Sequence, residues 1–414
     1  MASLFGMFLI YYLNLIRSQA TLVGRSQTWN ASLATAEAGV EEALAQLNPG
    51  APAPFIDRAA NNWGGPVNGL YGPVSRVCGN GSYSVVISND TPPTIYSTGT
   101  ASNAALSGTL TRMLRVTTTN TALFSVGMAA KESINFTGNG VTTDSFNSAD
   151  PNLSENGMYP LDYPSRRSTN GDVASIGGLI NVGNANVNGT LYLGPTASDN
   201  MGANGYISGG VSNDFNVEFE DVIVPQTNWV SAVPLSTPLT TNGVSYKYVF
   251  PDSPVPTAVQ YYTLDGSGLN NQSLYVGSNQ HVTLLVAAST SPVNIRVGGA
   301  GTNSGQLTFY MDGPSFTLSG TNIVDSLNAL NFTYYGTTNN TQISFKGNAS
   351  FTGTIYAPEA DFKMGGGGSS IYDFVGSSVT KSVTMTGHYN FHFDENLMKA
   401  GPMRGYVATS WREL

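Results

Sequence analysis

The sequence predicts a mainly β fold with one long N-terminal α-helix, in which a small α+β head is followed by an irregular parallel β-helix, or solenoid. Three observations support this prediction. An apolar run opens the chain and continues into a one-sided helical pattern that ends near residue 48. Short alternating segments with polar turns follow, up to about residue 122. Beyond them, apolar pairs that end in glycine recur at intervals of about 20 residues, as in stacked coils.

Residues 1–48 are predicted to form one helix whose first part is apolar on all sides and whose second part is amphipathic. Residues 1–16 are almost entirely apolar, and an amphipathic pattern follows them. The apolar stripe consists of Leu33, Ala36, Val40, Ala43, Leu44 and Leu47, and the polar side of Glu37, Glu41, Glu42 and Gln46. Asn48-Pro49-Gly50 ends the helix, because proline commonly lies just beyond a helix end. Gly24 predicts a break between residues 18 and 26, since glycine costs ~1 kcal/mol relative to alanine in a helix.

The apolar half of this helix cannot remain in water alone. Its length is slightly short for a bilayer span, which takes about 20 residues, although Tyr11-Tyr12 and then Arg17 suit a membrane interface. One interpretation is an N-terminal membrane anchor. The other is a helix shared between a membrane and a filament core, where identical neighbours replace lipid. The residues expected in that core are Leu4, Phe5, Phe8, Leu9, Tyr12, Leu13, Ile16 and Val23.

Three polar motifs follow the apolar start: Arg17-Ser-Gln19, Arg25-Ser-Gln-Thr-Trp-Asn30 and Ala36-Glu-Ala-Gly-Val-Glu-Glu-Ala-Leu44. Together with that start they resemble the N-terminal helix of type IV pilin-like proteins, notably the PilX type. In that family a prepilin peptidase removes a short basic leader, and the mature helix packs into a filament core. Most members carry a glutamate at the fifth mature position, which pairs with a neighbour's N-terminal amine. This chain has Phe5, so either its mature start is not Met1 or its subunits align without that ion pair.

Composition favours an exported structural protein. Only 10% of the residues are charged, where about 25% is usual, and 47 are glycine. The formal charge of −9 and the lack of clustered Lys and Arg argue against nucleic acid as a partner. Cys78 is the single cysteine, which excludes an intrachain disulfide and a cysteine-built metal site.

Residues 49–122 are predicted to contain a linker and a three-stranded meander. The linker is rich in proline and glycine up to Val77, and the strands lie near residues 83–87, 95–99 and 110–117. A meander of this size needs a cover for its apolar face, and the one-sided half of the helix supplies it. This arrangement is the pilin-like head that the resemblance implies.

Residues 123–397 are predicted to form the solenoid, with an excursion or a small inserted sheet at about 221–290. An antiparallel sandwich is the alternative for this body. Residues 398–414 are expected to be a C-terminal tail that docks on this molecule or on a neighbour. The body also resembles poorly characterised β-solenoid domains found behind such pilin-like helices. The stretches that carry this resemblance are Gly353-Thr-Ile-Tyr-Ala-Pro358, Phe374-Val-Gly-Ser-Ser and Phe391-His-Phe-Asp-Glu-Asn396, and the resemblance implies no activity.

Asp214, Glu218 and Glu220 alternate with apolar residues on a predicted strand. Same-face neighbours on a strand lie roughly 6–7 Å apart. Carboxylates at that spacing could hold Ca²⁺ with carbonyl groups and water, or act as a hydrolase pair. The plainer interpretation is a solvated acidic face on a strand whose other face is core.

His388, His392 and Asp394 alternate with aromatic residues near the end of the body. Two imidazoles and a carboxylate on one strand face could form an open three-ligand zinc site. Neighbours on a strand diverge, however, and a structural terminal coil is the plainer interpretation. The sequence therefore predicts no metal, no cofactor and no catalytic residue.

Two classes of function remain. In the first, the chain is a structural subunit of an extracellular type IV pilus-like filament, a helical homopolymer that forms through the N-terminal helix and displays the β-rich body. The resemblance implies a membrane-inserted precursor, the inner membrane, and pilus assembly and prepilin-processing machinery as partners. A minor, tip-located adhesin is a variant of this class. The second class is a membrane-anchored β-helix enzyme acting on polysaccharide. We expect no enzyme, because the Asn-Thr-Asp and Gly-His-Gly signatures of galacturonases are missing.

Overall fold

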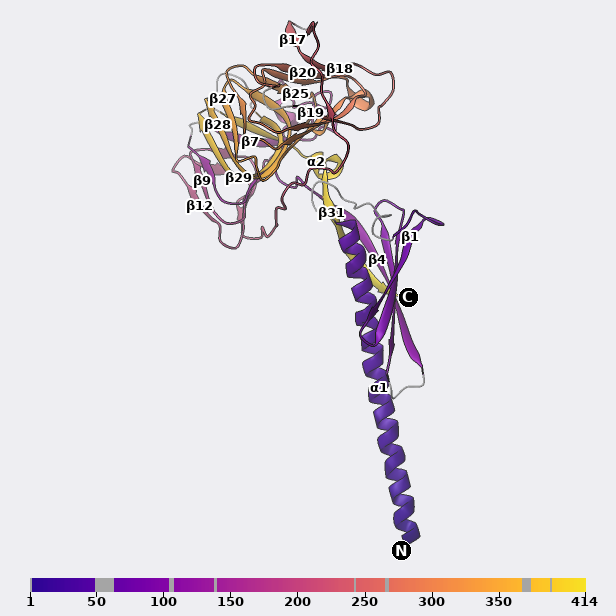
Figure 1. The fold of residues 1–414 in the computed structure, drawn as a ribbon. Coiled ribbons are helices and arrows are strands. Elements are labelled where there is room, and N and C mark those ends of the chain that lie inside the picture. The colour runs from indigo at the N-terminus through magenta and orange to yellow at the C-terminus, as the bar shows by residue number, and fades with distance from the viewer. Residues whose placement is uncertain are drawn as a thin grey trace. The chain divides into compact units, whose positions relative to one another are not determined.

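The chain folds into two compact units in a computed structural model (Figure 1). The head comprises Met1–Thr121 and Met403–Leu414, and the body comprises Ala122–Pro402. The predicted fold class is confirmed, since the chain is mainly β with one long N-terminal helix. The structure describes residues 2–48, 63–103, 108–137, 140–241, 243–264, 268–366, 374–387 and 389–414.

The N-terminal helix is continuous. Helix α1 (Ala2–Leu47) has 46 residues, which corresponds to a length of roughly 70 Å. The predicted break near Gly24 is therefore wrong. One glycine is a small cost in a helix that already propagates cooperatively, and the Thr21 and Thr28 hydroxyls donate to the carbonyls of Arg17 and Gly24 within the same helix.

The head contains a five-stranded sheet in the order β1-β2-β3-β4-β31. Its strands are β1 (Leu70–Cys78), β2 (Gly81–Ser88), β3 (Thr94–Ser102), β4 (Thr109–Ala122) and β31 (Met403–Glu413). The predicted meander is present as β2–β4, which pair antiparallel. Two strands were missed. A register shift between Tyr71 and Val74 interrupts the pattern of β1. The predicted C-terminal tail does dock on this molecule, and it does so as edge strand β31 beside β4.

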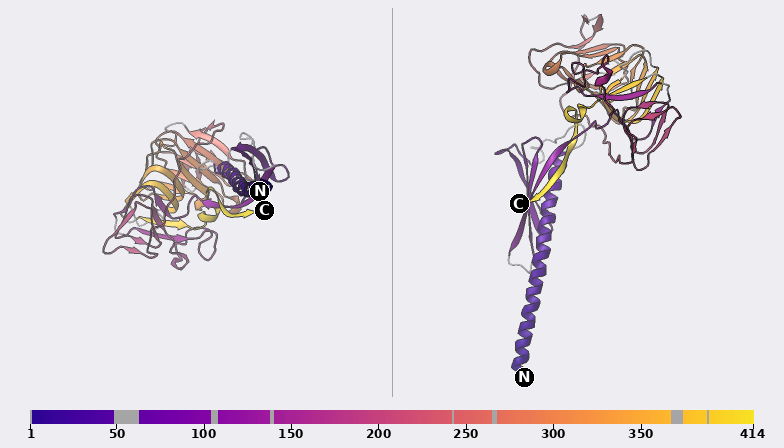
Figure 2. Two further views of the ribbon diagram at one scale, coloured as in Figure 1. Left: turned by 90° about the horizontal axis from the view of Figure 1, so that it is seen from below. Right: turned by 180° about the vertical axis from the view of Figure 1, so that it is seen from behind.

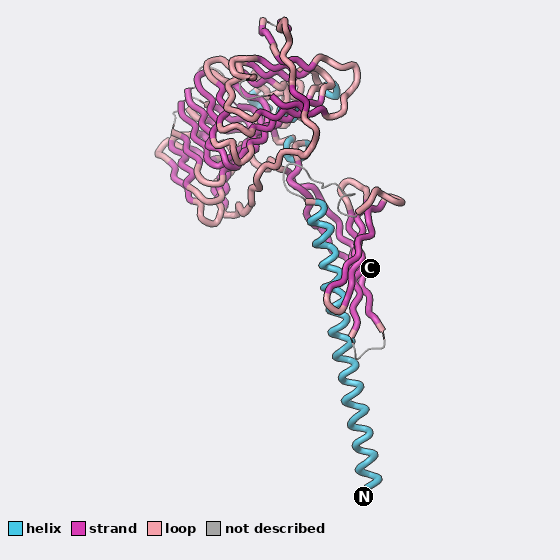
Figure 3. Tube along the Cα trace, viewed as in Figure 1, coloured by secondary structure: helices cyan, strands magenta, loops and turns pink. Residues whose placement is uncertain are grey.

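The one-sided half of α1 covers this sheet, as Figure 3 shows for the cyan helix and the adjacent strands. Ala36, Val40, Ala43 and Leu47 are fully buried, which confirms the predicted apolar stripe. Gln46, predicted on the polar side, is buried as well. The stripe is thus wider than the sequence pattern indicated.

Glycine allows α1 to approach the sheet closely. A Cβ on Gly99 of β3 would lie 2.3 Å from the carbonyl oxygen of Ser32. Nearby, the Ser97 hydroxyl donates to the Ala36 carbonyl at 2.7 Å. On the flank of the helix, Glu42 accepts hydrogen bonds from Arg76 and Tyr83. These contacts fix the second half of α1 to the head.

The body is built from parallel strands in stacked turns of chain. Its large sheet has 24 strands, and pairings such as β21–β23, β23–β26 and β28–β29 are parallel. The strands are β5 (Met128–Ala130), β6 (Ile134–Phe136), β7 (Thr142–Phe146), β8 (Val173–Ser175), β9 (Leu179–Gly183), β10 (Asn186–Val187), β11 (Leu191–Leu193), β12 (Ser198–Met201), β13 (Tyr206–Ile207), β14 (Val211–Ser212), β15 (Val230–Ser231), β18 (Tyr248–Phe250), β19 (Gln260–Leu264), β20 (Ser273–Val276), β21 (His281–Val286), β22 (Asn294–Val297), β23 (Gln306–Met311), β24 (Ser315–Leu318), β25 (Ile323–Asp325), β26 (Phe332–Gly336), β27 (Gln342–Gly347), β28 (Ser350–Gly366), β29 (Phe374–Gly387) and β30 (Asn390–Asp394). Parallel pairing is the geometry that stacked coils require and an antiparallel sandwich lacks.

The predicted excursion at 221–290 is wrong for most of its length. Strands β15 and β18–β21 belong to the stack, and only β16 (Leu239–Thr241) and β17 (Val244–Tyr246) form a separate antiparallel hairpin. The error lies in the pairing of these strands, because they join the parallel stack and do not form a sheet of their own. Short helical turns complete the body: Pro164–Arg166, Gly301–Asn303, Ala329–Asn331 and α2 (Leu397–Ala400).

The chain does not wind through the body from one end to the other. The first turn, β5–β7, pairs on one side with β8–β10 and on the other with the last strands, β29 and β30. The first and last segments of the body meet where the Leu123 amide donates to the Pro402 carbonyl at 2.9 Å. The body thus begins and ends at one place, which lets it be inserted between β4 and β31 of the head.

Candidate functional site

The first half of α1 presents an apolar surface to solvent. The right-hand view of Figure 2 shows this part of the helix extending past the head sheet. Phe5 is 75% exposed and Tyr11 is 82% exposed. The eight predicted filament-core residues are all exposed: Leu4, Phe5, Phe8, Leu9, Tyr12, Leu13, Ile16 and Val23.

The polar groups along this surface do little to interrupt it. No charged residue precedes Arg17, and the Ser18 and Thr21 hydroxyls donate to carbonyls of the helix itself. The first turn of the described helix has no acidic residue. Among the helices of the described chain, none combines the length and hydropathy of a membrane span.

An exposed apolar surface of this extent favours association. Contiguous apolar patches larger than a few hundred Å² mark interaction sites on soluble proteins. Burying one Leu, Ile or Phe side chain contributes about 1.5–3 kcal/mol. The candidate functional site is therefore the surface of α1 between Leu4 and Val23, and what it can do is bind other apolar surfaces.

The acidic candidates Asp214, Glu218 and Glu220 lie on a segment without strands that connects β14 to β15. The predicted strand is therefore wrong, but the predicted alternation is correct. Asp214, Glu218 and Glu220 are exposed, whereas Phe215 and Phe219 are buried. Within the described ranges, no three His, Cys, Asp or Glu side chains are grouped to hold a metal ion.

This connecting segment is fixed to the body by aromatic contacts. The Phe215 ring lies 6.4 Å from that of Tyr192 and 6.3 Å from that of Phe219. Farther along, the Tyr356 hydroxyl donates to the Glu220 carbonyl at 2.8 Å. Apolar and acidic residues alternate in this segment because the apolar side chains pack on the body and the acidic ones face solvent.

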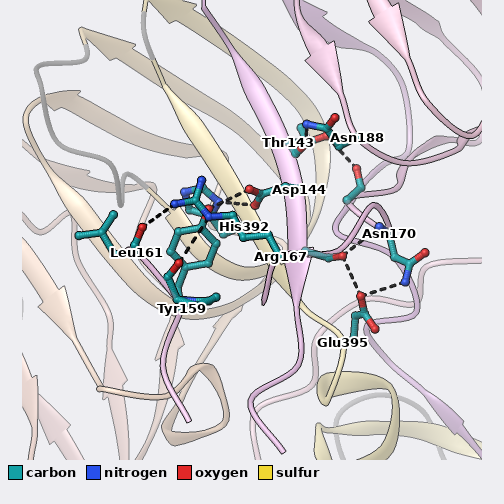
Figure 4. Close-up of polar contacts among 12 residues, drawn as sticks. Thr143, Asp144, Tyr159, Leu161, Arg167, Asn170, Asn188, His392 and Glu395 are labelled. Carbon is teal, nitrogen blue, oxygen red and sulfur yellow. Dashed lines mark hydrogen bonds and ion pairs between the residues drawn. The ribbon is translucent and has the colours of Figure 1, made fainter. Parts of the chain in front are cut away.

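The two described candidates of the histidine group, His392 and Asp394, lie in different surroundings. His388 lies outside the described residues. His392 and Asp394 are both buried on β30 but have different partners. The Nδ1 atom of His392 lies 2.5 Å from Oδ1 of Asp144 on β7 (Figure 4). Asp394 Oδ1 instead accepts hydrogen bonds from the amides of Ser148 and Asn396.

Tyr159 completes the cluster around Asp144. Its hydroxyl donates to Asp144 Oδ2 at 2.8 Å, and its ring stacks on His392 with centroids 3.8 Å apart (Figure 4). Burial and the Asp144 carboxylate hold the pKa of Tyr159 far above its usual value, so it remains a hydrogen-bond donor. Sequence reasoning missed Asp144 and Tyr159, because 248 residues separate Asp144 from His392 and no local spacing connects them.

Asp394 is expected to make stability depend on pH. Burial raises its pKa above the usual value of 3.8, and its Oδ2 atom has no hydrogen-bond partner in the structure. The folded protein therefore holds this proton more tightly than the unfolded chain does, so the contribution to stability falls as pH rises above about 3.8. Asn at this position keeps the Oδ1 acceptor without a charge. Thermal unfolding should be measured for both proteins at pH 3.5 and at pH 7. The stability of Asp394→Asn relative to the unmodified protein should be greater at pH 7 than at pH 3.5, and the opposite trend would contradict a raised pKa of Asp394.

Comparison with known proteins gives limited matches. A family described as a domain of unknown function (DUF7305) matches residues 255–400, all within the body. No curated protein matches the sequence. Among solved structures, the crystal structure of the competence-associated pilin ComZ from Thermus thermophilus is similar, with 12% identity and a TM-score of 0.29 over 94% of this chain and 97% of that chain. At this identity and TM-score, the similarity supports no residue-level statement.

Proposed function

We propose that the chain is a structural subunit of an extracellular type IV pilus-like filament. It polymerises through the first half of α1 and displays the body on the outside. The observation that carries this proposal is the exposed and mostly apolar surface between Leu4 and Val23, in which Arg17 is the one charged residue and which extends beyond the head sheet. Such a surface requires an apolar partner, and other copies of the same helix provide one.

The proposed assembly is a helical homopolymer. When different patches of identical subunits bind each other and the rotation between subunits does not close a ring, the assembly is an open helical filament. Helices bundled along one axis bury the apolar residues of α1 and leave the polar surfaces of each subunit outside. We propose that packing of the exposed apolar side chains between Leu4 and Val23 aligns neighbouring subunits.

Before assembly, the same surface needs another apolar environment. We propose that the precursor is held in the inner membrane and is delivered by prepilin-processing and pilus assembly machinery. The apolar run and the Tyr11-Tyr12 pair support this step. A main subunit and a minor, tip-located adhesin would share this geometry. Antibodies against the body distinguish them, since they label fibres along their length in the first case and at their ends in the second.

We propose no catalytic role for the body. Asp214, Glu218 and Glu220 lie exposed along one connecting segment, and His392 is buried against Asp144. These positions suit packing and solubility better than an acid–base pair, which needs two groups that face one substrate. Turnover of an acidic polysaccharide by the purified protein would contradict this proposal.

Removing residues 1–23 tests the filament proposal. The deletion removes every predicted core residue and leaves the buried stripe of α1 in the head. We expect the unmodified protein to form fibres in negative-stain images and the truncated protein to elute as a soluble monomer in size-exclusion chromatography with light scattering. Unchanged circular dichroism of the remaining β structure is the control for folding. Fibres formed by the truncated protein would exclude α1 as the polymerising element.

A further inference from the structure

The body contains a cleft of about 440 Å³ that the filament proposal does not use. This volume lies within the range of about 300–1,000 Å³ found for ligand pockets. Its lining residues come from β25, from the neighbouring strands β28 and β29, and from the loop after β7. They are Glu155, Met158, Tyr159, Leu161, Asp162, Ile323, Val324, Asp325, Leu327, Ser350, Thr352 and Val375.

Adjacent strands of the stack form the floor of the cleft. Ile323 of β25 pairs with Ser350 of β28, and Thr352 of β28 pairs with Val375 of β29. Parallel pairing holds these side chains in register, so the floor offers alternating methyl and hydroxyl groups at fixed spacing. The floor is therefore formed before any ligand binds.

The loop at residues 155–162 forms the wall of the cleft and is fixed by its own contacts. Arg166 donates to the Ser154 carbonyl and Arg167 to the Leu161 carbonyl, each at 2.8 Å. Tyr159 anchors the middle of the loop through Asp144 and His392 (Figure 4). The buried histidine cluster thus supports the wall of the cleft.

The cleft carries negative charge. Glu155, Asp162 and Asp325 line it, and none of the three forms an ion pair within the described residues. Two nearby arginines, Arg166 and Arg167, are occupied at loop carbonyls and lie 4.3 Å and 4.9 Å from the ring centroids of Tyr163 and Tyr159. Arg296 of β22 is the register partner of Asp325, so it offsets one of the three negative charges and leaves the lining net negative. An anionic ligand is therefore disfavoured. A metal ion is disfavoured too, because no three His, Cys, Asp or Glu side chains of the described residues are grouped to hold one.

A neutral sugar is a poorer fit than a cation. Sugar sites commonly offer an open aromatic face, but His392 and Arg167 both contact the faces of the Tyr159 ring. The apolar lining is aliphatic instead and comes from Met158, Leu161, Ile323, Leu327 and Val375. Aliphatic walls with carboxylates at their edges complement a molecule with an alkyl body and a positive charge.

We propose that this cleft binds a small organic cation, namely an ammonium group carried on an aliphatic body. The ammonium group donates charge-assisted hydrogen bonds to Asp325 and Glu155, and the aliphatic body packs on Ile323, Leu327 and Val375. The Ser350 and Thr352 hydroxyls accept or donate further hydrogen bonds. Free diamines and lysine side chains carry an ammonium group on an aliphatic body, whereas amino sugars carry it on a polar ring.

Equilibrium dialysis of labelled cadaverine against the full-length protein in nonionic detergent tests this proposal. We expect saturable binding at low salt that weakens as NaCl is added, because partly exposed charges are screened. The isosteric but uncharged 1,5-pentanediol and the anion glutarate should not compete. Competition by Nα-acetyl-lysine amide or by glucosamine then identifies which source of the ammonium group fits best.

Single substitutions locate the site. Asp325→Asn keeps the Oδ1 acceptor that binds the Leu327 amide and should weaken cadaverine binding about tenfold, the usual scale for one charge-assisted hydrogen bond. Glu155→Gln removes the charge of the other proposed contact and should also weaken binding, which gives a second reading if the first variant is poorly folded. Asp199→Asn on exposed strand β12 makes the same charge change outside the cleft and should bind normally. Absence of saturable binding, equal competition by pentanediol, or an equal loss in Asp199→Asn would overturn the proposal.

Discussion

Leu13→Asp is expected to abolish filament formation while leaving the head and the body folded. Leu13 is more than half exposed on α1, and no contact in the described subunit depends on it. In the proposed filament it is buried among neighbouring helices. The expected result is a protein with unchanged circular dichroism that sediments as a small species and gives no fibres in negative-stain images.

The size of this effect follows from the apolar surroundings. The substitution loses the burial of one leucine, about 1.5–3 kcal/mol. It also places a carboxylate among the apolar side chains of neighbouring helices. Arg17 lies one turn away on the same helix, but burying such an ion pair still costs several kcal/mol per ion, so the substitution opposes the contact. In a homopolymer every interface carries the substitution, so the cost is repeated along the fibre.

Val77→Asp is the matched control. Val77 is 83% exposed on β1 of the head, and it receives the same new charge. Fibres should form normally if assembly depends on α1, because head positions are not proposed to lie in the filament core. Fibres from Leu13→Asp, or their loss in Val77→Asp alone, would contradict assembly through the predicted core residues.

Local patterns predicted the helix and most of the head. Ala36, Val40, Ala43 and Leu47 recur at helical spacing, and all four are buried against the sheet. A periodic pattern of this kind is a property of neighbouring residues, so the sequence alone contains it. Gly24 misled the prediction, because the cost of one glycine is small compared with the cooperativity of a long helix.

The missed features depend on contacts between residues far apart in the chain. Strand β31 lies beside β4 in the head sheet, although the whole body separates the two strands in the sequence. Asp214–Glu220 has the alternation of a strand, but an extended segment becomes a strand only when a partner is available for its backbone hydrogen bonds. Likewise, nothing near Asp144 in the sequence indicates His392. All three features depend on which distant residues become neighbours, and local alternation does not specify that.

Closure of the body is the clearest example of such a non-local contact. Strands β29 and β30 pair with β5–β7, so the last turn of the chain covers the first. Until that contact forms, both turns expose apolar side chains. We infer that the stability of the first turn depends on residues more than two hundred positions later, and Phe374 at the start of β29 is the position at which to test this.

Phe374→Ala is expected to destabilise the body by about 3–5 kcal/mol, the usual cost of truncating a buried phenylalanine. Phe374 is fully buried, and its ring stacks on Phe391 at 4.4 Å and on Phe351 at 5.0 Å between centroids. Chemical denaturation should show the loss, whereas Tyr206→Ala, at an exposed position of β13, should change stability little. Hydrogen exchange should show that β5–β7 lose protection together with β28–β30, because the last turn covers the first. Loss of protection confined to β28–β30 would contradict this coupling.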